Sequence, residues 1–359
     1  MAVDEAVDVV LHIGADKTGT TTIQQLFRHN RRALAERGIL YPRSPGKVRH
    51  AGLSLYARPD EVLLASRDWR RGDYTDPAVF RRRLRRRLRR EVVQSGASSM
   101  VLSDEALYRM TAVSITRLRG LVTPSARRLR VVLYVRRQDD HLVSRYQQAV
   151  KVGQVQPLDV WALRDYRNMY DFAGRIATWR DALQPTDVVV RPFERSRFHK
   201  GSLVEDFADA SGIDLRVDDL RPIEVRNESL GVEGVEMLRI LNLHRIQNLG
   251  LETWQISNRA HVRMLRETTT GPQVTLPEAD LDRFMAQWEA SNRQVAVDHL
   301  GDPTGELFGE PRKTAGTTVE QVLDPTRLGH YLELLEIPEQ EREPIRRIAE
   351  LEASRSSAH

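Results

Sequence analysis

The sequence predicts an α/β protein of three layers, in which helices cover both faces of a parallel β-sheet, with a helical C-terminal extension. Two observations support this fold class. Short apolar runs alternate with amphipathic helical patterns up to about residue 200, which is the arrangement of parallel sheets and their crossover helices. Beyond residue 225 the patterns are helical.

Five apolar runs have the length and residue types of buried strands. They cover residues 9–13, 38–41, 99–103, 129–135 and 187–193. A helical pattern lies between the first two runs and ends at Gly38, and Asp76 with Pro77 marks a later helix start. Because ligands of parallel sheets bind at the carboxyl ends of the strands, the residues that follow each strand are the candidates for function.

The chain is expected to have two parts. Residues 1–225 would form the α/β core, and residues 226–359 a mainly helical extension that walls the site. Helical patterns at residues 230–249 and 281–300 support the second part. No clear linker separates the two parts, so we expect one integrated domain.

The composition excludes several kinds of site. The 359 residues include no cysteine, which excludes disulfides, zinc–thiolate sites and cysteine nucleophiles. The ten histidines fall in no metal-binding pattern such as H-E-x-x-H, so no metal is expected. No run reaches the roughly 18 apolar residues of a membrane helix, and the acidic N-terminus does not resemble a signal peptide. We therefore expect a cytoplasmic protein without a membrane span.

An arginine-rich run covers residues 80–91. Its Phe80, Leu84 and Leu88 recur every four residues, which predicts a helix that buries one face and keeps its arginines in water. Aromatic residues are not interleaved with the arginines, as they are in platforms for single-stranded nucleic acid, so no nucleic-acid partner is expected. Attraction of a polyanionic acceptor is the alternative.

A turn rich in glycine and threonine follows the first strand. The residues expected to bind phosphate there are Gly14, Asp16, Lys17, Thr18, Gly19, Thr20, Thr21 and Thr22. Backbone N–H groups at the start of the next helix would face the anion, together with the hydroxyls. In nucleoside triphosphatases the lysine follows the second glycine, whereas Lys17 precedes Gly19 in this chain.

A second candidate phosphate site follows the fourth strand. Arg136 leaves the strand, and Ser144 lies eight residues later, near the start of the next helix. An arginine at a strand end and a serine near a helix start can hold a separate phosphate. Asp139 or Asp140 would cap the helix.

These two segments resemble a known family. "HIGADKTGTT" is similar to the 5′-phosphosulfate loop of sulfotransferases that use 3′-phosphoadenosine-5′-phosphosulfate (PAPS). "YVRRQDDHLVSRYQQ" resembles their 3′-phosphate segment, with Arg136, Asp140 and Ser144 at the family's intervals. Further similar segments extend the resemblance over residues 9–241, although Arg137 and Gln138 stand where many relatives have asparagine and proline.

The resemblance implies a P-loop-like fold and an in-line transfer of the PAPS sulfonate. The acceptor would be a hydroxyl or amine of a carbohydrate or small-molecule natural product, and 3′,5′-diphosphoadenosine (PAP) would be released without a metal. Lys17 would stabilise the charge that develops on the bridging oxygen as the bond breaks.

The resemblance also points to the end of the third strand as the source of the general base. Glu105 is the expected base, and Asp104 and His50 are the alternatives. Contacts with the acceptor are expected from His50, Tyr166, Arg167 and Tyr170.

Two other functions compete with this one. "VLSDE" also resembles a Walker B strand, so a P-loop kinase or ATPase with Asp104 on Mg²⁺ is an alternative. That function would leave Arg136 and Ser144 without a role. A non-catalytic polyanion-binding protein would leave the phosphate loop unexplained, and its binding would fall steeply with salt.

Overall fold

The computed structural model describes residues 6–72, 74–223, 229–268, 271–314 and 320–356. The chain divides into two compact units, each built from three segments. The sheet unit comprises Met1–Arg137, Tyr166–Val225 and Trp288–Glu310. The helical unit comprises Gln138–Asp165, Arg226–Gln287 and Pro311–His359. Each unit is described by itself.

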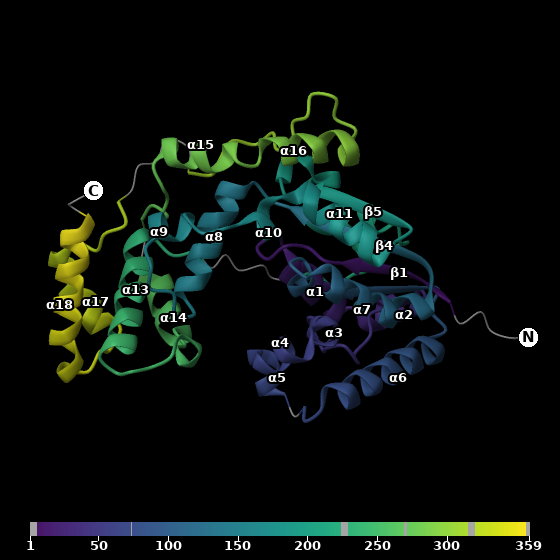
Figure 1. Cartoon of the computed structure of the whole chain (residues 1–359), viewed down its shortest axis with the longest axis horizontal. Coiled ribbons are helices and arrows are strands. Elements are labelled where there is room, and N and C mark those ends of the chain that lie inside the picture. Colours follow the sequence, from purple (N-terminus) through teal and green to yellow (C-terminus); the bar gives the residue numbers. More distant parts are fainter. Residues whose placement is uncertain (1–5, 73, 224–228, 269–270, 315–319, 357–359) are drawn as a thin grey trace, which may run out of the picture. The chain divides into compact units, whose positions relative to one another are not determined.

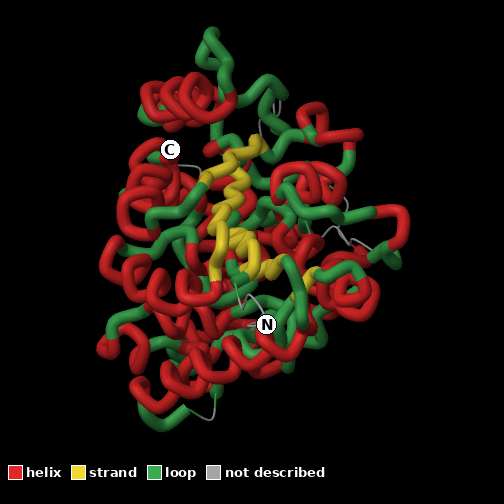
Figure 2. The backbone as a smooth tube through the Cα atoms, turned by 90° about the vertical axis from the view of Figure 1, so that its right-hand side faces the viewer, coloured by secondary structure: helices red, strands yellow, loops and turns green. Residues whose placement is uncertain are grey.

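A five-stranded parallel sheet forms the centre of the sheet unit (Figures 1 and 2). Its strands are β1 Val7–His12, β2 Ile39–Leu40, β3 Ser99–Ser103, β4 Ala126–Val135 and β5 Asp187–Pro192. The predicted α/β class and the positions of all five strands are confirmed. The second strand is shorter than expected, with two residues, and the fourth begins three residues earlier.

The strand order β2-β3-β1-β4-β5 determines where a ligand can bind. From β1 the chain continues to β2 on one side of the sheet, and from β4 it continues to β5 on the other. The crevice outside the carboxyl ends of β1 and β4 is therefore the topological switch point. The register pairs His12 with Ser103 of β3 and with Val132 of β4, so these strand ends meet at one edge.

Helices of the sheet unit cover both faces of the sheet (Figure 1). They are α1 Thr20–His29, α2 Arg31–Glu36, α3 Ala51–Ala57, α4 Asp60–Ala65, α5 Arg67–Arg71, α6 Pro77–Ser95, α7 Ala112–Val122, α10 Arg167–Tyr170, α11 Phe172–Leu183, α12 Leu203–Ser211 and α16 Glu289–Val295. On one face, Ile23 and Phe27 of α1 and Phe207 of α12 form a buried cluster with Val10 and Val132 of the sheet. This cluster holds α1 against the strand that precedes the phosphate loop.

The helical pattern after β1 is interrupted at Asn30, which separates α1 from α2. The Asn30 side chain donates to the carbonyl of Leu26 at 2.9 Å and to that of Arg221 at 3.0 Å. It also accepts from the backbone N–H of Arg221 at 2.8 Å. An asparagine that satisfies backbone groups in this way ends the helix earlier than the apolar spacing indicates.

The helical unit contains α8 Gln138–Val150, α9 Leu158–Ala162, α13 Val232–Gln247, α14 Arg259–Thr268, α15 Glu278–Ala286, α17 Leu328–Leu334 and α18 Glu339–Ser356. A buried ion cluster joins α13 to α18. Arg239 of α13 lies 2.5 Å from Glu236 of the same helix and 2.5 Å from Glu352 of α18. Because the guanidinium and Glu236 are nearly fully buried, each charge depends on its partners.

The expected boundary at residue 225 coincides with one point where the chain passes between the units. Two segments lie on the other side of that division. Residues 138–165 belong to the helical unit, and Trp288–Glu310 belongs to the sheet unit. The second assignment has a clear cause, because Trp288 packs edge-on against Tyr170 at 5.8 Å and the Ser291 hydroxyl donates to Asp171 at 2.9 Å.

The arginine-rich run forms the long helix α6, and its predicted buried face is confirmed. Phe80, Leu84, Leu88 and Val92 are all buried. The helix begins as predicted, with Asp76 accepting from the Val79 N–H at 2.6 Å and Pro77 at the first position.

Replacement of Leu84 by alanine tests whether this face is core. We expect the free energy of unfolding to fall by about 2–5 kcal/mol, because the deletion leaves a cavity under α6. Arg86→Ala, on the exposed side of the same helix, should change it by less than about 0.5 kcal/mol. Urea unfolding measures both. Equal effects of the two substitutions would contradict the assignment of the faces.

Candidate functional site

The loop between β1 and α1 has an unusual backbone at two positions. Lys17 has φ 65° and Gly19 has φ 75°, so both lie in the left-handed region. That conformation is strained for a lysine and free for a glycine. A Cβ at Gly19 would also lie 2.3 Å from Leu203 of α12. Glycine is therefore required at residue 19 both by its φ and by the close approach of α12.

The start of α1 is suited to an anion. Within the described part of the chain, no side chain caps this helix, and its first turn holds no acidic residue. Its first backbone N–H groups therefore lack an intramolecular cap, and the helix dipole adds a partial positive charge there. Thr20 is buried, whereas Thr21 is exposed and Thr22 half-buried. A phosphate or sulfate at such a helix start is favoured.

The other loop residues expected from the sequence have distinct roles. Thr18 is fully buried, and its hydroxyl donates to the Ala15 carbonyl at 2.6 Å, which braces the loop. Gly14 is buried, and Asp16 and Lys17 are half-buried. Asp16 and Lys17 thus lie at the accessible side of the loop, above its braced base.

Arg136 connects this loop to the end of β4. Its Nη1 donates to the carbonyl of Lys17 at 3.3 Å, so the two predicted phosphate segments meet at the switch point between β1 and β4. Ser144 lies on α8, in the helical unit. The pairing of Arg136 with Ser144 around one phosphate stays a prediction.

Glu105 begins a short 3₁₀ helix directly after β3 and is partly exposed, with 22% of its side chain accessible. Its Oε2 accepts from Gln24 of α1 at 2.8 Å, and its Oε1 pairs with Arg49 at 3.3 Å. The carboxylate is thereby held in one orientation beside the first turns of α1. Of the three candidate bases, it is the accessible one.

Asp104 is fully buried, and the structure corrects its predicted catalytic role. Its Oδ1 pairs with Arg49 at 3.0 Å and accepts from the Ala106 N–H at 3.1 Å, and its Oδ2 accepts from the Ser54 N–H at 3.3 Å. Burial raises the pKa of Asp104 to about 6, against the opposing effect of Arg49. With no exposed surface and both oxygens engaged inside the protein, this carboxylate contacts no acceptor in this arrangement.

His50 is also fully buried, and neither its catalytic nor its acceptor-binding role is compatible with the structure. Its Nε2 donates to the Pro42 carbonyl at 3.0 Å, and its Nδ1 accepts from the Ser103 N–H at 3.1 Å. The ring packs on Tyr41 with centroids 4.3 Å apart. Both ring nitrogens are thus hydrogen-bonded to backbone groups. Burial lowers the pKa of His50 to about 3. His50 therefore fastens the loop before α3 to β3.

Three site residues were missed by the sequence analysis: His12, Gln24 and Arg49. His12 is the last residue of β1 and is fully buried; its position directly before the glycine turn was a usable signal. Arg49 lies within 3.3 Å of Asp104, Glu105 and Asp68; burial lowers its pKa, but these carboxylates outweigh that effect together and raise it. No local pattern marks Gln24 or Arg49, because their partners lie far away in the sequence.

The aromatic residues expected to contact an acceptor are mainly core residues. Tyr170 is fully buried and Tyr166 is 7% exposed. The centroids of their rings lie 5.3 Å apart. The ring of Tyr170 also packs against Trp288. This corrects the predicted acceptor role of Tyr170 and gives Tyr166 mainly a packing role. Arg167, which begins α10, is exposed.

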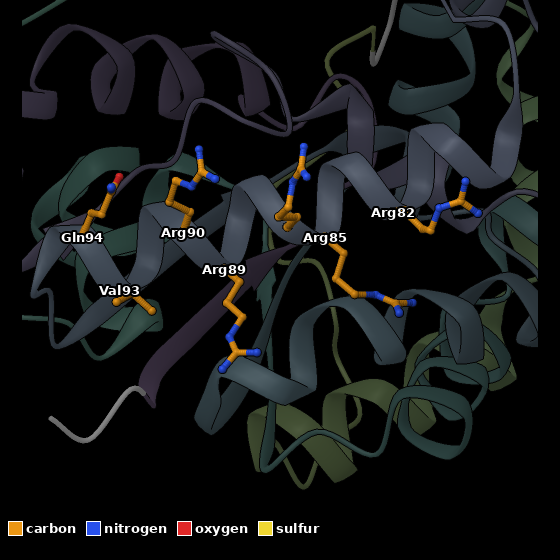
Figure 3. Close-up of a pocket in the computed structure, with 7 residues that line it drawn as sticks. Arg82, Arg85, Arg89, Arg90, Val93 and Gln94 are labelled. Carbon is orange, nitrogen blue, oxygen red and sulfur yellow. The ribbon is translucent and has the colours of Figure 1, made fainter. Parts of the chain in front are cut away.

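The arginines of α6 line a shallow surface depression of about 530 Å³ (Figure 3). Its lining residues are Arg82, Arg85, Arg86, Arg89, Arg90, Val93 and Gln94, all from this one helix. The depression is thus the space between long, splayed side chains. It agrees with the prediction that the arginines face water.

The described ranges hold neither a metal-binding cluster nor a membrane-spanning helix. They hold no group of three or more histidine, cysteine, aspartate or glutamate side chains arranged to bind a metal ion. Nor does any helix in these ranges have the length and apolar character needed to cross a membrane.

Comparisons with known proteins add one distant relative. No protein-family model matches the chain, and no solved structure matches it. An uncharacterized protein of Archaeoglobus fulgidus is 26% identical over 214 residues, which are 59% of this chain and 56% of that protein. The chain thus spans about half the length of the curated relative it matches.

The buried, neutral state of His50 predicts a pH dependence of stability. Its folded pKa lies below the unfolded value of 6.5, so its contribution is complete above pH 6.5 and is lost as the pH falls towards 3. The slope is about 1.4 kcal/mol per pH unit for one proton. Between pH 6.5 and 4, the free energy of unfolding measured with urea should fall less steeply with decreasing pH in the His50→Gln variant than in the wild type.

Two comparisons make this measurement specific. His12 is buried and neutral in both proteins, so the difference in slope isolates His50. His29→Gln removes an exposed histidine and should leave the slope unchanged. Equal slopes for His50→Gln and the wild type would show that His50 is protonated in the folded protein.

Proposed function

We propose that the protein is a sulfotransferase that moves the sulfonate of PAPS to a hydroxyl or amine acceptor and releases PAP. One observation carries the proposal. Lys17 precedes the loop glycine, adopts a left-handed backbone, and has its carbonyl held by Arg136 across the switch point. A nucleoside triphosphatase loop carries its lysine after that glycine.

The residues of the loop fit a phosphosulfate group. Uncapped N–H groups at the start of α1 and the Lys17 ammonium favour an anion, whereas the Thr18 hydroxyl is committed to the Ala15 carbonyl. A fully buried nitrogen, His12 Nε2, has no hydrogen-bond partner in the described part of the chain and lies beside Gly14. When bound, PAPS supplies the sulfonate and the phosphate leaving group.

Lys17 and Glu105 have complementary tasks in this proposal. The ammonium of Lys17 offsets negative charge at the loop, and a compact point charge suits that task. Glu105 removes the proton of the acceptor, because it is the accessible carboxylate at the neighbouring strand end. Arg49 and Gln24 hold its two oxygens and orient it.

Arg136 and Ser144 are proposed to bind the 3′-phosphate. The support is the position of Arg136 at the end of β4, beside the loop, and the sequence interval between the two residues. The acceptor class, a carbohydrate or small-molecule natural product, and the cytoplasm as the compartment are further parts of this proposal. They rest on the resemblance and the composition described above.

Calorimetric titration with PAP, run beside ATP with magnesium, tests the donor site. We expect PAP to bind and ATP with magnesium to bind weakly. Lys17→Ala and Arg136→Ala should each weaken PAP binding by about 10- to 100-fold, since each removes a charged hydrogen-bond donor.

Arg86→Ala serves as the matched control, because it removes one positive charge from the exposed side of α6, away from the loop. It should change PAP affinity by less than about twofold, as expected for a screened surface charge. Binding of ATP with magnesium alone would exclude the sulfotransferase function and favour the kinase. An equal loss in Arg86→Ala would indicate nonspecific attraction.

A further inference from the structure

His12 carries a polar atom that the fold leaves unsatisfied. The side chain is fully buried, and its Nε2 has no hydrogen-bond partner among the described residues. Its Nδ1 lies 2.9 Å from the Ser103 hydroxyl. An unsatisfied buried polar group is destabilising, and such groups are rare unless a ligand or water completes them.

The unsatisfied nitrogen faces the inner side of the phosphate loop. A Cβ at Gly14 would lie 2.6 Å from Nε2 of His12, 3.2 Å from the Thr18 hydroxyl and 3.3 Å from the Thr20 methyl group. Glycine at residue 14 therefore leaves room for the imidazole, and Nε2 converges with the two threonines.

A chain of hydrogen bonds runs from Glu105 through Gln24 and Ser103 to His12. Glu105 accepts from Gln24 Nε2 at 2.8 Å, which orients the Gln24 amide with its nitrogen towards the carboxylate. The same nitrogen donates to the Ser103 hydroxyl at 3.3 Å. Ser103, which accepts from Gln24, can donate its own hydroxyl proton to Nδ1 of His12, 2.9 Å away. The proton of the imidazole is left on Nε2, where it faces the loop.

The surroundings of the ring favour a neutral imidazole. Tyr134 and Phe207 contact it edge-on, with ring centroids 6.0 Å and 5.2 Å away. Burial lowers the pKa of His12 to about 3. A neutral imidazole offers one N–H and one lone pair, so the assignment of its single proton decides whether the loop meets a donor or an acceptor.

We propose that His12 donates its Nε2–H to the anion bound by the loop, and that Glu105 sets this tautomer through Gln24 and Ser103. His12 is then a ligand-binding residue at the floor of the loop. Gln24, Ser103 and Glu105 are positioning residues for it. The proposal rests on the anion-binding part of the proposed function and adds a second task for Glu105, distinct from proton removal.

The relay makes a specific prediction for Glu105→Gln. Arg49 donates to the Oε1 position, so the new amide places its oxygen there and its NH₂ towards Gln24. Gln24 must then turn its oxygen to this NH₂ and to Ser103. The Ser103 hydroxyl donates to Gln24, and His12 donates from Nδ1 instead. A bare lone pair on Nε2 then faces the anion, which disfavours binding.

Nitrogen-15 NMR of histidine-labelled protein tests the tautomer without any substitution. In the wild type, we expect a protonated Nε2 and an unprotonated Nδ1 at His12. Addition of PAP, or of pyrophosphate as a simpler probe, should shift the Nε2–H signal and slow its exchange with water. A proton on Nδ1 in the wild type, or an unchanged Nε2–H signal at saturating PAP, would overturn the proposal.

Variants extend the test to affinity. His12→Phe keeps the ring but lacks the donor, and it should weaken PAP binding by about 10- to 100-fold. Glu105→Gln should weaken it at least about tenfold and move the His12 proton to Nδ1, although removal of an acceptor proton plays no part in PAP binding. His29→Gln and Glu36→Gln, both at exposed sites, are the matched controls and should change affinity less than about twofold.

The outcomes separate this inference from the proposed function. If pyrophosphate shifts the His12 signal but PAP does not bind, the sulfotransferase proposal fails and this inference stands. If PAP binds and Glu105→Gln binds it as tightly as the wild type, the relay is wrong and the proposed function stands. If neither anion binds, both fail. If the His12→Phe protein does not fold, the NMR titration of the wild type and the PAP affinity of Glu105→Gln still test the proposed role of His12.

Discussion

The rest of the site depends on the buried ion pair between Asp104 and Arg49. The Asp104 carboxylate holds Arg49, the N–H of Ser54 and the N–H of Ala106 at distances of 3.0–3.3 Å. Three segments meet there: the end of β3, the loop before α3, and α3 itself. Because the carboxylate is removed from water, loss of Arg49 would leave its charge uncompensated, which is costly. Arg49, once fixed by Asp104, is in place to orient Glu105.

Burial and hydrogen bonding give residues of the same type different roles. Asp104 and Glu105 are neighbours in the chain, yet Asp104 is enclosed and Glu105 remains accessible. His12 and His50 are both enclosed and neutral, but His50 uses both nitrogens on backbone groups, while Nε2 of His12 lacks a partner among the described residues. The two enclosed histidines therefore differ in one unsatisfied atom, on which the proposed anion-binding role of His12 rests.

The backbone of Lys17 is strained at the centre of the candidate site. A left-handed lysine is unfavourable by roughly 1 kcal/mol or more, and the loop keeps it through the Arg136 hydrogen bond and the brace from Thr18 to Ala15. Strained residues that neighbouring contacts hold in place are common at ligand sites. The same hydrogen bond joins the residue that follows β4 to the loop that follows β1. The sheet topology, which makes these two strands neighbours, therefore allows the contact that holds the loop.

The sequence by itself determined the features that depend on neighbours along the chain: the five strands, the lysine before Gly19, and the buried face of α6. The tertiary structure alone decided that Asp104 and His50 are enclosed, and that Gln24 and Arg49 join the site. It also decided which histidine faces the loop. The physical reason is distance along the chain. Local spacing encodes strands and helix faces, but whether a buried polar atom finds a partner depends on residues such as Ser103, 91 positions from His12.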